Sequence, residues 1–289
     1  MAGEFFPADS IERFRVAYPQ QPALLNHRLA AHPLLEIEAL AQLAERLPAH
    51  EVEYNAADLP IGITEQAPSN GLSAAETLRT IEANGSWMVL KRVEQDPAYA
   101  ALLRAVLAEV RDTVLPVTGE MLQLEAFIFV SSPNATTPLH YDPEYNILLQ
   151  LRGEKVMTVF PADDAEIKSP EFEEEYHSGG FRNLPWRDEF APRGRPFAIR
   201  TGEAIYVPVG APHWVKNGPA TSISFSVTWR SRWSFHEADA HSFNRRLRRL
   251  GLEPAPPRRF PHDNLLKSIA HRSLARAARA RLPILFGSR

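Results

Sequence analysis

Two imidazoles and one carboxylate stand in this sequence with the spacing of a metal site. His140 and Asp142 are separated by a single residue, and His213 follows in a segment rich in Pro and Val. Alternate residues of a β-strand point to the same face, so His140 and Asp142 can reach one metal ion while Tyr141 points away. Two His and one carboxylate on one face of an octahedron leave the opposite positions open, an arrangement typical of non-haem Fe(II) oxygenases. The pattern therefore predicts an iron site that does chemistry.

The triplet His-x-Asp is weak evidence by itself, because both residue types are common enough for it to arise by chance. His213 alone would be read as a histidine held by hydrogen bonds at the edge of the core, beside Trp214. The strand pattern changes this interpretation, because His140 opens one strand and His213 lies in the connection between two others. We expect strands at 122–130, 146–151, 155–160, 202–208 and 222–229.

Short strands at this spacing, joined by Gly and Pro turns, predict a mainly β fold with flanking α-helices, built on a double-stranded β-helix or jelly roll of the cupin kind. Helical spacing of Leu, Ala and Val predicts helices at 33–47 and 97–115. A stretch rich in Pro, Gly and acidic residues between 162 and 196 predicts a long loop, a candidate lid over a substrate. We expect three regions, namely an N-terminal part that supports the barrel (1–118), the jelly-roll core (119–232) and a basic helical extension (233–289).

Motifs in the central part of the chain carry a resemblance to a known family. Thr137-Pro-Leu-His-Tyr-Asp142 is followed by Asn146, by Gly153-Glu-Lys155 and by Phe160-Pro161, and Gly202-Glu-Ala-Ile-Tyr-Val-Pro208 leads to His213. In order and spacing these motifs resemble the cupin-like JmjC family of Fe(II)- and 2-oxoglutarate-dependent oxygenases, especially its asparaginyl-hydroxylase-like branch. The resemblance covers about residues 120 to 230.

The resemblance implies a role for each matching residue. Lys155 would pair with the distal carboxylate of 2-oxoglutarate, and the Thr137 hydroxyl would bond the same carboxylate. Asn146 would line the co-substrate pocket. Relatives often carry an Asn on the strand after the distal His, whereas this chain has Ser224, Ser226 and Thr228 there. The residues implied to bind Fe(II) are His140, Asp142 and His213.

The implied activity is that of a dioxygenase. With Fe(II) as cofactor and with 2-oxoglutarate and O2 as co-substrates, it would couple decarboxylation of 2-oxoglutarate to hydroxylation of a C–H bond, in a protein side chain or a small molecule. No catalytic residue beyond the metal ligands is implied. N-demethylation uses the same chemistry and stays open. The alternative is a non-catalytic metal-binding cupin with a regulatory or nucleic-acid-linked role, and Lys155 and Thr137 discriminate, because such a protein needs no dicarboxylate anchor.

Lys155 has a simpler interpretation as an exposed lysine at a hairpin turn. The neighbouring triad and the chemistry of a dicarboxylate favour the binding role, because a fixed ammonium compensates part of the lost hydration through a charge-assisted hydrogen bond.

The composition limits the class of protein to which this chain can belong. The chain has 289 residues, 44% of them hydrophobic, and no Cys, so it can bury a sizeable core and has no disulfide or thiolate metal site. The first residues lack a basic segment followed by an apolar one, and no apolar run is long enough for a transmembrane helix. We therefore expect a cytoplasmic enzyme.

Charge is distributed unevenly along the chain. Residues 245–289 contain twelve Lys and Arg against only Glu253 and Asp263, whereas the chain as a whole is slightly acidic. Residues 262–282 have the pattern of a basic amphipathic helix. We expect this helix to serve packing or formation of a homodimer first, contact with a membrane surface next, and nucleic-acid binding last. His236 and His241 do not share a helical face well, so we expect them at a surface or an interface.

Overall fold

The structure is a computed structural model, and it describes residues 3–56 and 70–280. The chain forms two compact units. Unit 1 contains the described residues up to Ile167 together with Arg182–Ser231, and unit 2 contains Lys168–Phe181 and the described residues from Arg232 onward. The three regions expected from the sequence, with boundaries near 118 and 232, stay a prediction.

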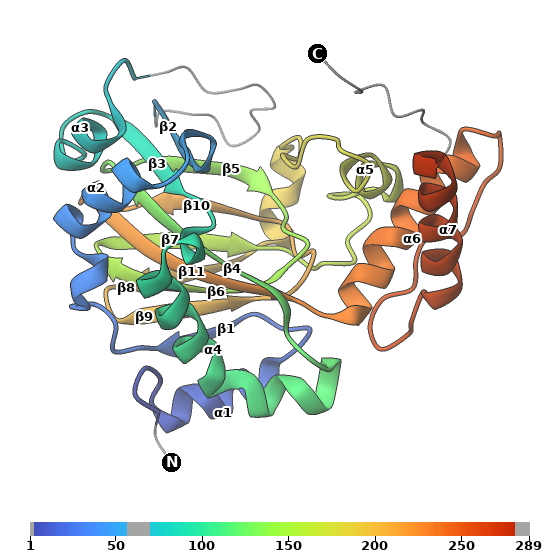
Figure 1. Ribbon diagram of the computed structural model, residues 1–289, viewed down its shortest axis with the longest axis horizontal. Coiled ribbons are helices and arrows are strands. Elements are labelled where there is room, and N and C mark those ends of the chain that lie inside the picture. Colours follow the sequence, from blue (N-terminus) through green and yellow to red (C-terminus); the bar gives the residue numbers. More distant parts are fainter. Residues whose placement is uncertain (1–2, 57–69, 281–289) are drawn as a thin grey trace. The chain divides into compact units, whose positions relative to one another are not determined.

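Unit 1 is built on two antiparallel sheets (Figure 1). The larger sheet has seven strands in the order β1-β9-β6-β11-β4-β3-β2, and the smaller has four in the order β5-β10-β7-β8. The fold class predicted from the sequence, two antiparallel sheets of the cupin and JmjC kind with flanking helices, is confirmed. The strands of the large sheet are β1 (Ala23–Asn26), β2 (Val52–Ala56), β3 (Ser86–Leu90), β4 (Leu122–Ser131), β6 (Tyr145–Arg152), β9 (Glu203–Val207) and β11 (Ser222–Arg230). Those of the small sheet are β5 (Thr136–His140), β7 (Glu154–Val159), β8 (Arg195–Arg200) and β10 (His213–Asn217).

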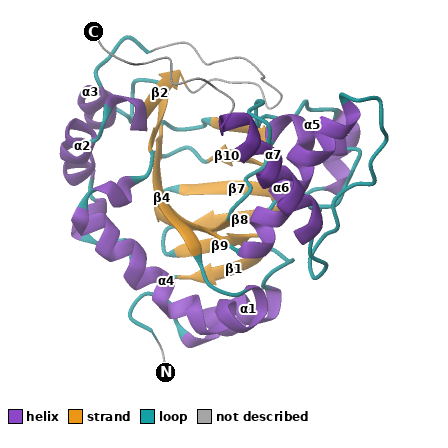
Figure 2. Cartoon of the chain, turned by 45° about the vertical axis from the view of Figure 1, so that its right-hand side comes forward, coloured by secondary structure: helices purple, strands orange, loops and turns teal. Residues whose placement is uncertain are grey.

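Helices cover the outer face of the large sheet (Figure 2). The longest, α4, begins where the Asp96 side chain accepts a hydrogen bond from the Ala98 backbone and Pro97 takes the first helical position. It ends at Gly119, whose φ of 83° lies in the left-handed region that favours glycine. The helices of unit 1 are α1 (Ala8–Ala17), α2 (Ile37–Arg46), α3 (Ala74–Arg79) and α4 (Pro97–Thr118), with short 3-10 turns η1 (Pro33–Leu35), η2 (Ala49–Glu51), η3 (Val93–Gln95) and η4 (Asp188–Arg193).

The alternation of β11 explains how a hydrophobic sheet can line a polar interior. Its apolar residues, among them Phe225 and Trp229, pack with the helices in the main core. Its polar residues alternate with them and therefore point to the opposite face, toward the small sheet. Every residue of β11 is buried, so this polar side is shielded from solvent. The strand thus supplies Ser222, Ser224, Ser226 and Thr228 to the space between the sheets.

Unit 2 is helical, with α5 (Pro170–Tyr176), α6 (Arg232–Arg248) and α7 (Leu265–Ala280). The predicted long loop at 162–196 is wrong in part, because it contains α5 and η4, and β8 begins at Arg195. The predicted exposure of His236 and His241 is also wrong, because both are buried. The last two residues of the predicted helix at 262–282 lie outside the described residues. Within the described ranges no helix is long and apolar enough to cross a membrane.

Ion pairs inside unit 2 account for much of the charge asymmetry seen in the sequence. Arg248 of α6 contacts Glu174 of α5 at 2.8 Å, and Arg245 contacts Glu175 at 2.5 Å. Arg259 contacts the buried Glu173 at 3.0 Å. The acidic segment that suggested a lid is therefore neutralised by the basic extension of the same chain.

Candidate functional site

The two histidines of the sequence motif meet on neighbouring strands. His140 is the last residue of β5, and His213 is the first residue of β10. The two strands are antiparallel, and these residues are direct cross-strand partners. Their ring centroids lie 4.3 Å apart, and both side chains are buried. Strand pairing therefore brings two of the three predicted metal ligands together.

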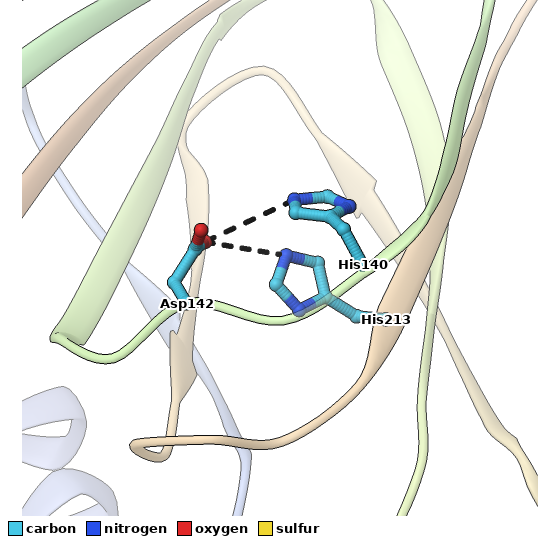
Figure 3. A group of neighbouring side chains, drawn as sticks. All are labelled: His140, Asp142 and His213. Carbon is cyan, nitrogen blue, oxygen red and sulfur yellow. Dashed lines mark ion pairs between the residues drawn. The ribbon is translucent and has the colours of Figure 1, made fainter. Parts of the chain in front are cut away.

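Asp142 completes the triad from the turn after β5. Its backbone carbonyl accepts a hydrogen bond of 2.9 Å from Gly210, in the turn that leads to β10. Its Oδ2 lies 3.9 Å from Nε2 of His140 and 3.7 Å from Nε2 of His213 (Figure 3). The three ligand atoms lie within 4.8 Å of one another, and this group can hold a metal ion.

Backbone carbonyls fix the orientation of both imidazoles. Nδ1 of His140 lies 2.7 Å from the carbonyl oxygen of Pro138, and Nδ1 of His213 lies 3.0 Å from that of Ala211. A carbonyl can only accept, so Nδ1 must carry the proton in each ring. The Nε2 lone pairs are therefore free to bind a metal, and an outer hydrogen bond of this kind orients metal-ligating histidines.

Burial and mutual charge keep the site ready for a cation. Burial lowers the pKa of His140 to about 3, and the neighbouring His213 contributes. Burial alone would raise the pKa of Asp142, but attraction to His140 when that ring is protonated, together with the Arg182 guanidinium, outweighs burial and lowers it. Neutral imidazole and ionised carboxylate are the forms that bind metal. With nitrogen and oxygen donors only, the set fits iron.

Thr137 is brought to the same side as His140 by an irregularity in the strand pairing. They are three positions apart, so on a regular strand they would point to opposite faces. The register shifts between His213 and Val215, whose partners on β5 are His140 and Thr137. Between these two pairs one residue of β10 thus opposes two of β5, which is the arrangement of a β-bulge. Because His213 and Val215 share a face, their partners share it as well.

Lys155 is a buried cation inside the barrel and not an exposed turn residue. Its ammonium donates a hydrogen bond of 2.7 Å to Oγ of Ser224, whose hydroxyl donates at 2.6 Å to Oε1 of Gln150. The Gln150 amide nitrogen in turn donates to Oγ of Ser222 at 2.9 Å. In the described part of the chain, Lys155 forms no ion pair with a carboxylate. Burial lowers its pKa to about 7.

Two further polar side chains lie in this interior. Asn146 on β6 is buried, and its Oδ1 accepts a hydrogen bond of 2.8 Å from Ser226. Asn217 on β10 is the cross-strand partner of Lys155. Its buried Oδ1 has no hydrogen-bond partner among the described residues.

The structure brings the three predicted metal ligands together and places the other predicted residues, Lys155, Thr137 and Asn146, on strands around them. Sequence reasoning missed Arg182, whose NH1 lies 3.2 Å from Oδ1 of Asp142. It also missed the hydrogen bonds by which Ser224 and Gln150 support Lys155, and the place of Asn217 across from Lys155. Period-two alternation in 222–229 is the only sequence signal that places one of these side chains inside the barrel. Nothing local marks Arg182, which lies in the stretch read as a loop.

Comparison with known proteins supports the fold. The profile of the family described as cupin-like domain matches residues 82–235, more than half of the chain. The search among curated proteins found no match to this chain. The X-ray structure of ycfD from E. coli has a TM-score of 0.50 and 16% sequence identity, over 97% of this chain and 70% of that one. A structure of YcfD described as a ribosomal oxygenase from Escherichia coli in complex with cobalt and 2-oxoglutarate has a TM-score of 0.49 and 17% identity, over 97% and 69%.

The family profile spans His140, Asp142 and His213, all four strands of the small sheet and every strand of the large sheet except β1 and β2. The chain belongs to the family of cupin-like domain proteins.

Proposed function

We propose that this protein is an Fe(II)- and 2-oxoglutarate-dependent oxygenase of the JmjC kind, and that it hydroxylates a protein side chain or a small molecule. The observation that carries the proposal is Lys155, a buried cation without a carboxylate partner among the described residues, in the same barrel interior as the metal-binding triad. A cupin that only holds a metal would need the triad but not the cation.

The triad supplies the first part of the argument. His140 and His213 present Nε2 toward Oδ2 of Asp142, and both Nδ1 atoms are held by carbonyls. We assign Fe(II) to these three residues. When bound there, iron would supply oxidative chemistry that protein side chains lack, driven by O2 and the decarboxylation of 2-oxoglutarate.

Lys155 supplies the second part. An ammonium taken out of water is costly unless an anion or strong acceptors surround it. Ser224 accepts one hydrogen bond from Lys155 and donates its own hydroxyl hydrogen to Gln150, so this hydroxyl has no hydrogen left to donate to the carboxylate of a ligand. The remaining protons of the ammonium are available for a carboxylate. We assign the distal carboxylate of 2-oxoglutarate to Lys155.

The distance between the two parts suits a short dicarboxylate. On the β7–β10 ladder, His213 pairs with Val159 and Asn217 pairs with Lys155. At about 3.3 Å per residue these pairs are separated by roughly 13 Å along the strands. The lysine side chain and the imidazole each extend into that gap, which leaves room for a molecule that chelates a metal at one end and carries a carboxylate at the other.

The polar residues around this gap would orient the co-substrate. Thr137 shares the inward face of β5 with His140, so its hydroxyl can donate to the same carboxylate as Lys155. The side-chain oxygen of Asn146 accepts a hydrogen bond from Ser226. Its amide nitrogen takes no part in that bond and is available to the pocket. Ser224 and Ser226 stand where relatives often carry an Asn, and they hold Lys155 and Asn146 in place.

An anaerobic titration with Fe(II) and 2-oxoglutarate tests the proposal. Chelation of iron by the keto acid gives a visible metal-to-ligand charge-transfer band, which we expect in the wild-type protein and not in His213→Ala. Metal binding without this band, at saturating 2-oxoglutarate, would contradict the oxygenase assignment and favour the non-catalytic cupin. Hydroxylation and N-demethylation share the band and are separated by the release of formaldehyde on turnover.

A further inference from the structure

We propose that Arg182 is a positioning residue that makes Asp142 offer a single carboxylate oxygen to the metal. This inference rests on the metal site of the proposed function. The two oxygens of Asp142 have different neighbours in the structure. Oδ2 faces the Nε2 atoms of His140 and His213, whereas Oδ1 lies 3.2 Å from NH1 of Arg182.

Backbone pairing holds Arg182 in place. Asn183 forms a bridge with His140, and the Leu184 backbone N–H donates a hydrogen bond of 2.8 Å to the carbonyl of Leu139. The short segment that begins at Arg182 therefore continues the small sheet beyond β5, on the side away from β10. Its guanidinium reaches Asp142 from a backbone that is tied to the strand carrying His140.

The consequence concerns the number of open metal positions. Two imidazoles and one carboxylate oxygen leave three positions of an octahedron for other ligands. A carboxylate that binds through both oxygens takes one more position, and carboxylates adopt either mode readily. A hydrogen bond from Arg182 to Oδ1 competes with the second mode. The open positions are what a chelating co-substrate and O2 would need.

A simple surface ion pair is the competing explanation, since the Arg182 side chain is 49% exposed. Exposed ion pairs contribute about 0–1 kcal/mol to stability and often nothing measurable. Stability therefore cannot decide between the two roles. Counting the waters on a bound metal can, because a surface ion pair has no reason to alter that count.

The test uses Mn(II) as the probe, with line broadening by 17O-labelled water in electron paramagnetic resonance as the measure of coordinated water. We expect Arg182→Met to hold Mn(II) with one coordinated water fewer than the wild type. Arg187→Met is the matched control, because Arg187 lies in the same segment, is about as exposed and contacts Glu189 instead of the triad. It should keep the wild-type count. A melting curve for each variant verifies the fold.

A second measurement separates this inference from the proposed function. We expect the affinity of the metal-loaded protein for 2-oxoglutarate to fall by about tenfold in Arg182→Met, because the second oxygen of Asp142 would compete with the chelating co-substrate; outer partners of metal ligands typically contribute at least this factor to metal affinity or activity. Equal water counts in wild type and Arg182→Met would overturn the inference. So would loss of Mn(II) binding in a variant that melts normally, because Arg182 would then serve metal affinity. A changed water count with no binding of 2-oxoglutarate by the wild type would uphold the inference and reject the oxygenase assignment.

Discussion

Lys155 and Asn217 are cross-strand partners on the β7–β10 ladder, and both side chains are buried. His213 lies on the same ladder, where it pairs with Val159, four residues along β10 from Asn217. The Lys155 ammonium has one hydrogen-bond acceptor, Ser224, and the side-chain Oδ1 of Asn217 accepts no hydrogen bond within the described residues. A strand pair that carries a metal ligand at one end thus carries a polar, incompletely satisfied cluster at the other.

Lys155→Met should abolish binding of 2-oxoglutarate and leave metal affinity unchanged, because it removes the ammonium but keeps an unbranched side chain only one atom shorter. It should also raise the stability of the unliganded protein by about 1 kcal/mol or more, since a buried charge is replaced by an apolar group. Calorimetric titration and thermal melting measure the two effects. The control is Lys216→Met, because Lys216 is exposed on β10. Wild-type 2-oxoglutarate affinity in Lys155→Met would remove that residue from its proposed role.

Binding of 2-oxoglutarate should take up a proton in mildly alkaline solution. Burial lowers the pKa of Lys155 from 10.5 to about 7, so the amine is largely neutral above that pH in the unliganded protein. A bound carboxylate requires the ammonium, so affinity should fall by up to about tenfold per pH unit above 7. Calorimetry in buffers of different ionisation enthalpy should find proton uptake near zero at about pH 6 and approaching one at about pH 8.5. Uptake that is the same at both values would contradict this.

His213→Ala should eliminate metal binding and with it the thermal stabilisation by metal. A ligand at a hundred times its Kd stabilises the native state by about 2.7 kcal/mol, which raises the melting temperature measurably. We expect this rise with Co(II) in the wild type and not in His213→Ala. His50→Ala is the matched control, because that histidine is 73% exposed and lies apart from the triad. If Co(II) raised the melting temperatures of His213→Ala and His50→Ala equally, the metal site would be rejected.

Gly153→Ala should destabilise unit 1 and weaken 2-oxoglutarate binding together. Gly153 joins β6 to β7 with a φ of +73°, and an added Cβ would lie 2.4 Å from the Thr221 carbonyl oxygen. Gly85 has a φ of +60° with no atom within 4 Å of such a Cβ. Gly85→Ala should therefore cost only the backbone strain, about 1–2 kcal/mol, and Gly153→Ala clearly more. Denaturant unfolding compares them, and equal costs would mean that the close approach to Thr221 relaxes.

Arg259→Ala should destabilise unit 2 by about 3 kcal/mol, because it takes a cation away from buried carboxylates. Arg259 contacts Glu173 at 3.0 Å and Glu237 at 3.0 Å, and both carboxylates are buried. Arg249→Ala, at an exposed position on the same chain segment, should cost little. Hydrogen exchange of α5 and α6 amides measures the local effect. Similar exchange in the two variants would show that other partners of Glu173 suffice.

Strands and helices with a clear period were predictable, and the elements that depend on long-range pairing were not. The strand expected at 222–229 and the helix expected at 97–115 agree with β11 and α4 within a few residues. β1 has only four residues and exists through its pairing with β9, so no local pattern reveals it. α5 was hidden by its Pro and acidic residues, which suit a first helical turn as well as a loop.

The site was predictable where residue type and spacing carry the chemistry. Residue type and spacing marked His140 and Asp142, although Asp142 lies in the turn after β5 and not on the strand that the prediction assumed, and His213 needed the family motif. Thr137 shows the limit, because a regular strand would turn it away from His140 and only the bulge returns it. Arg182 and Gln150 act through contacts across the fold, so their positions follow from tertiary structure alone.

The place of β5 in its sheet has a consequence for motion. β5 is the outermost strand beside β10, and among residues 3–56 and 70–280 only the segment at Asn183 and Leu184 adds pairing beyond it. Outer strands fray most easily, and His140 sits at the end of this one. A metal held by His140 and His213 would fasten β5 to its neighbour. Loss of the metal would then be coupled to local opening of that strand, and the rate of metal release would follow the rate at which the strand peels away.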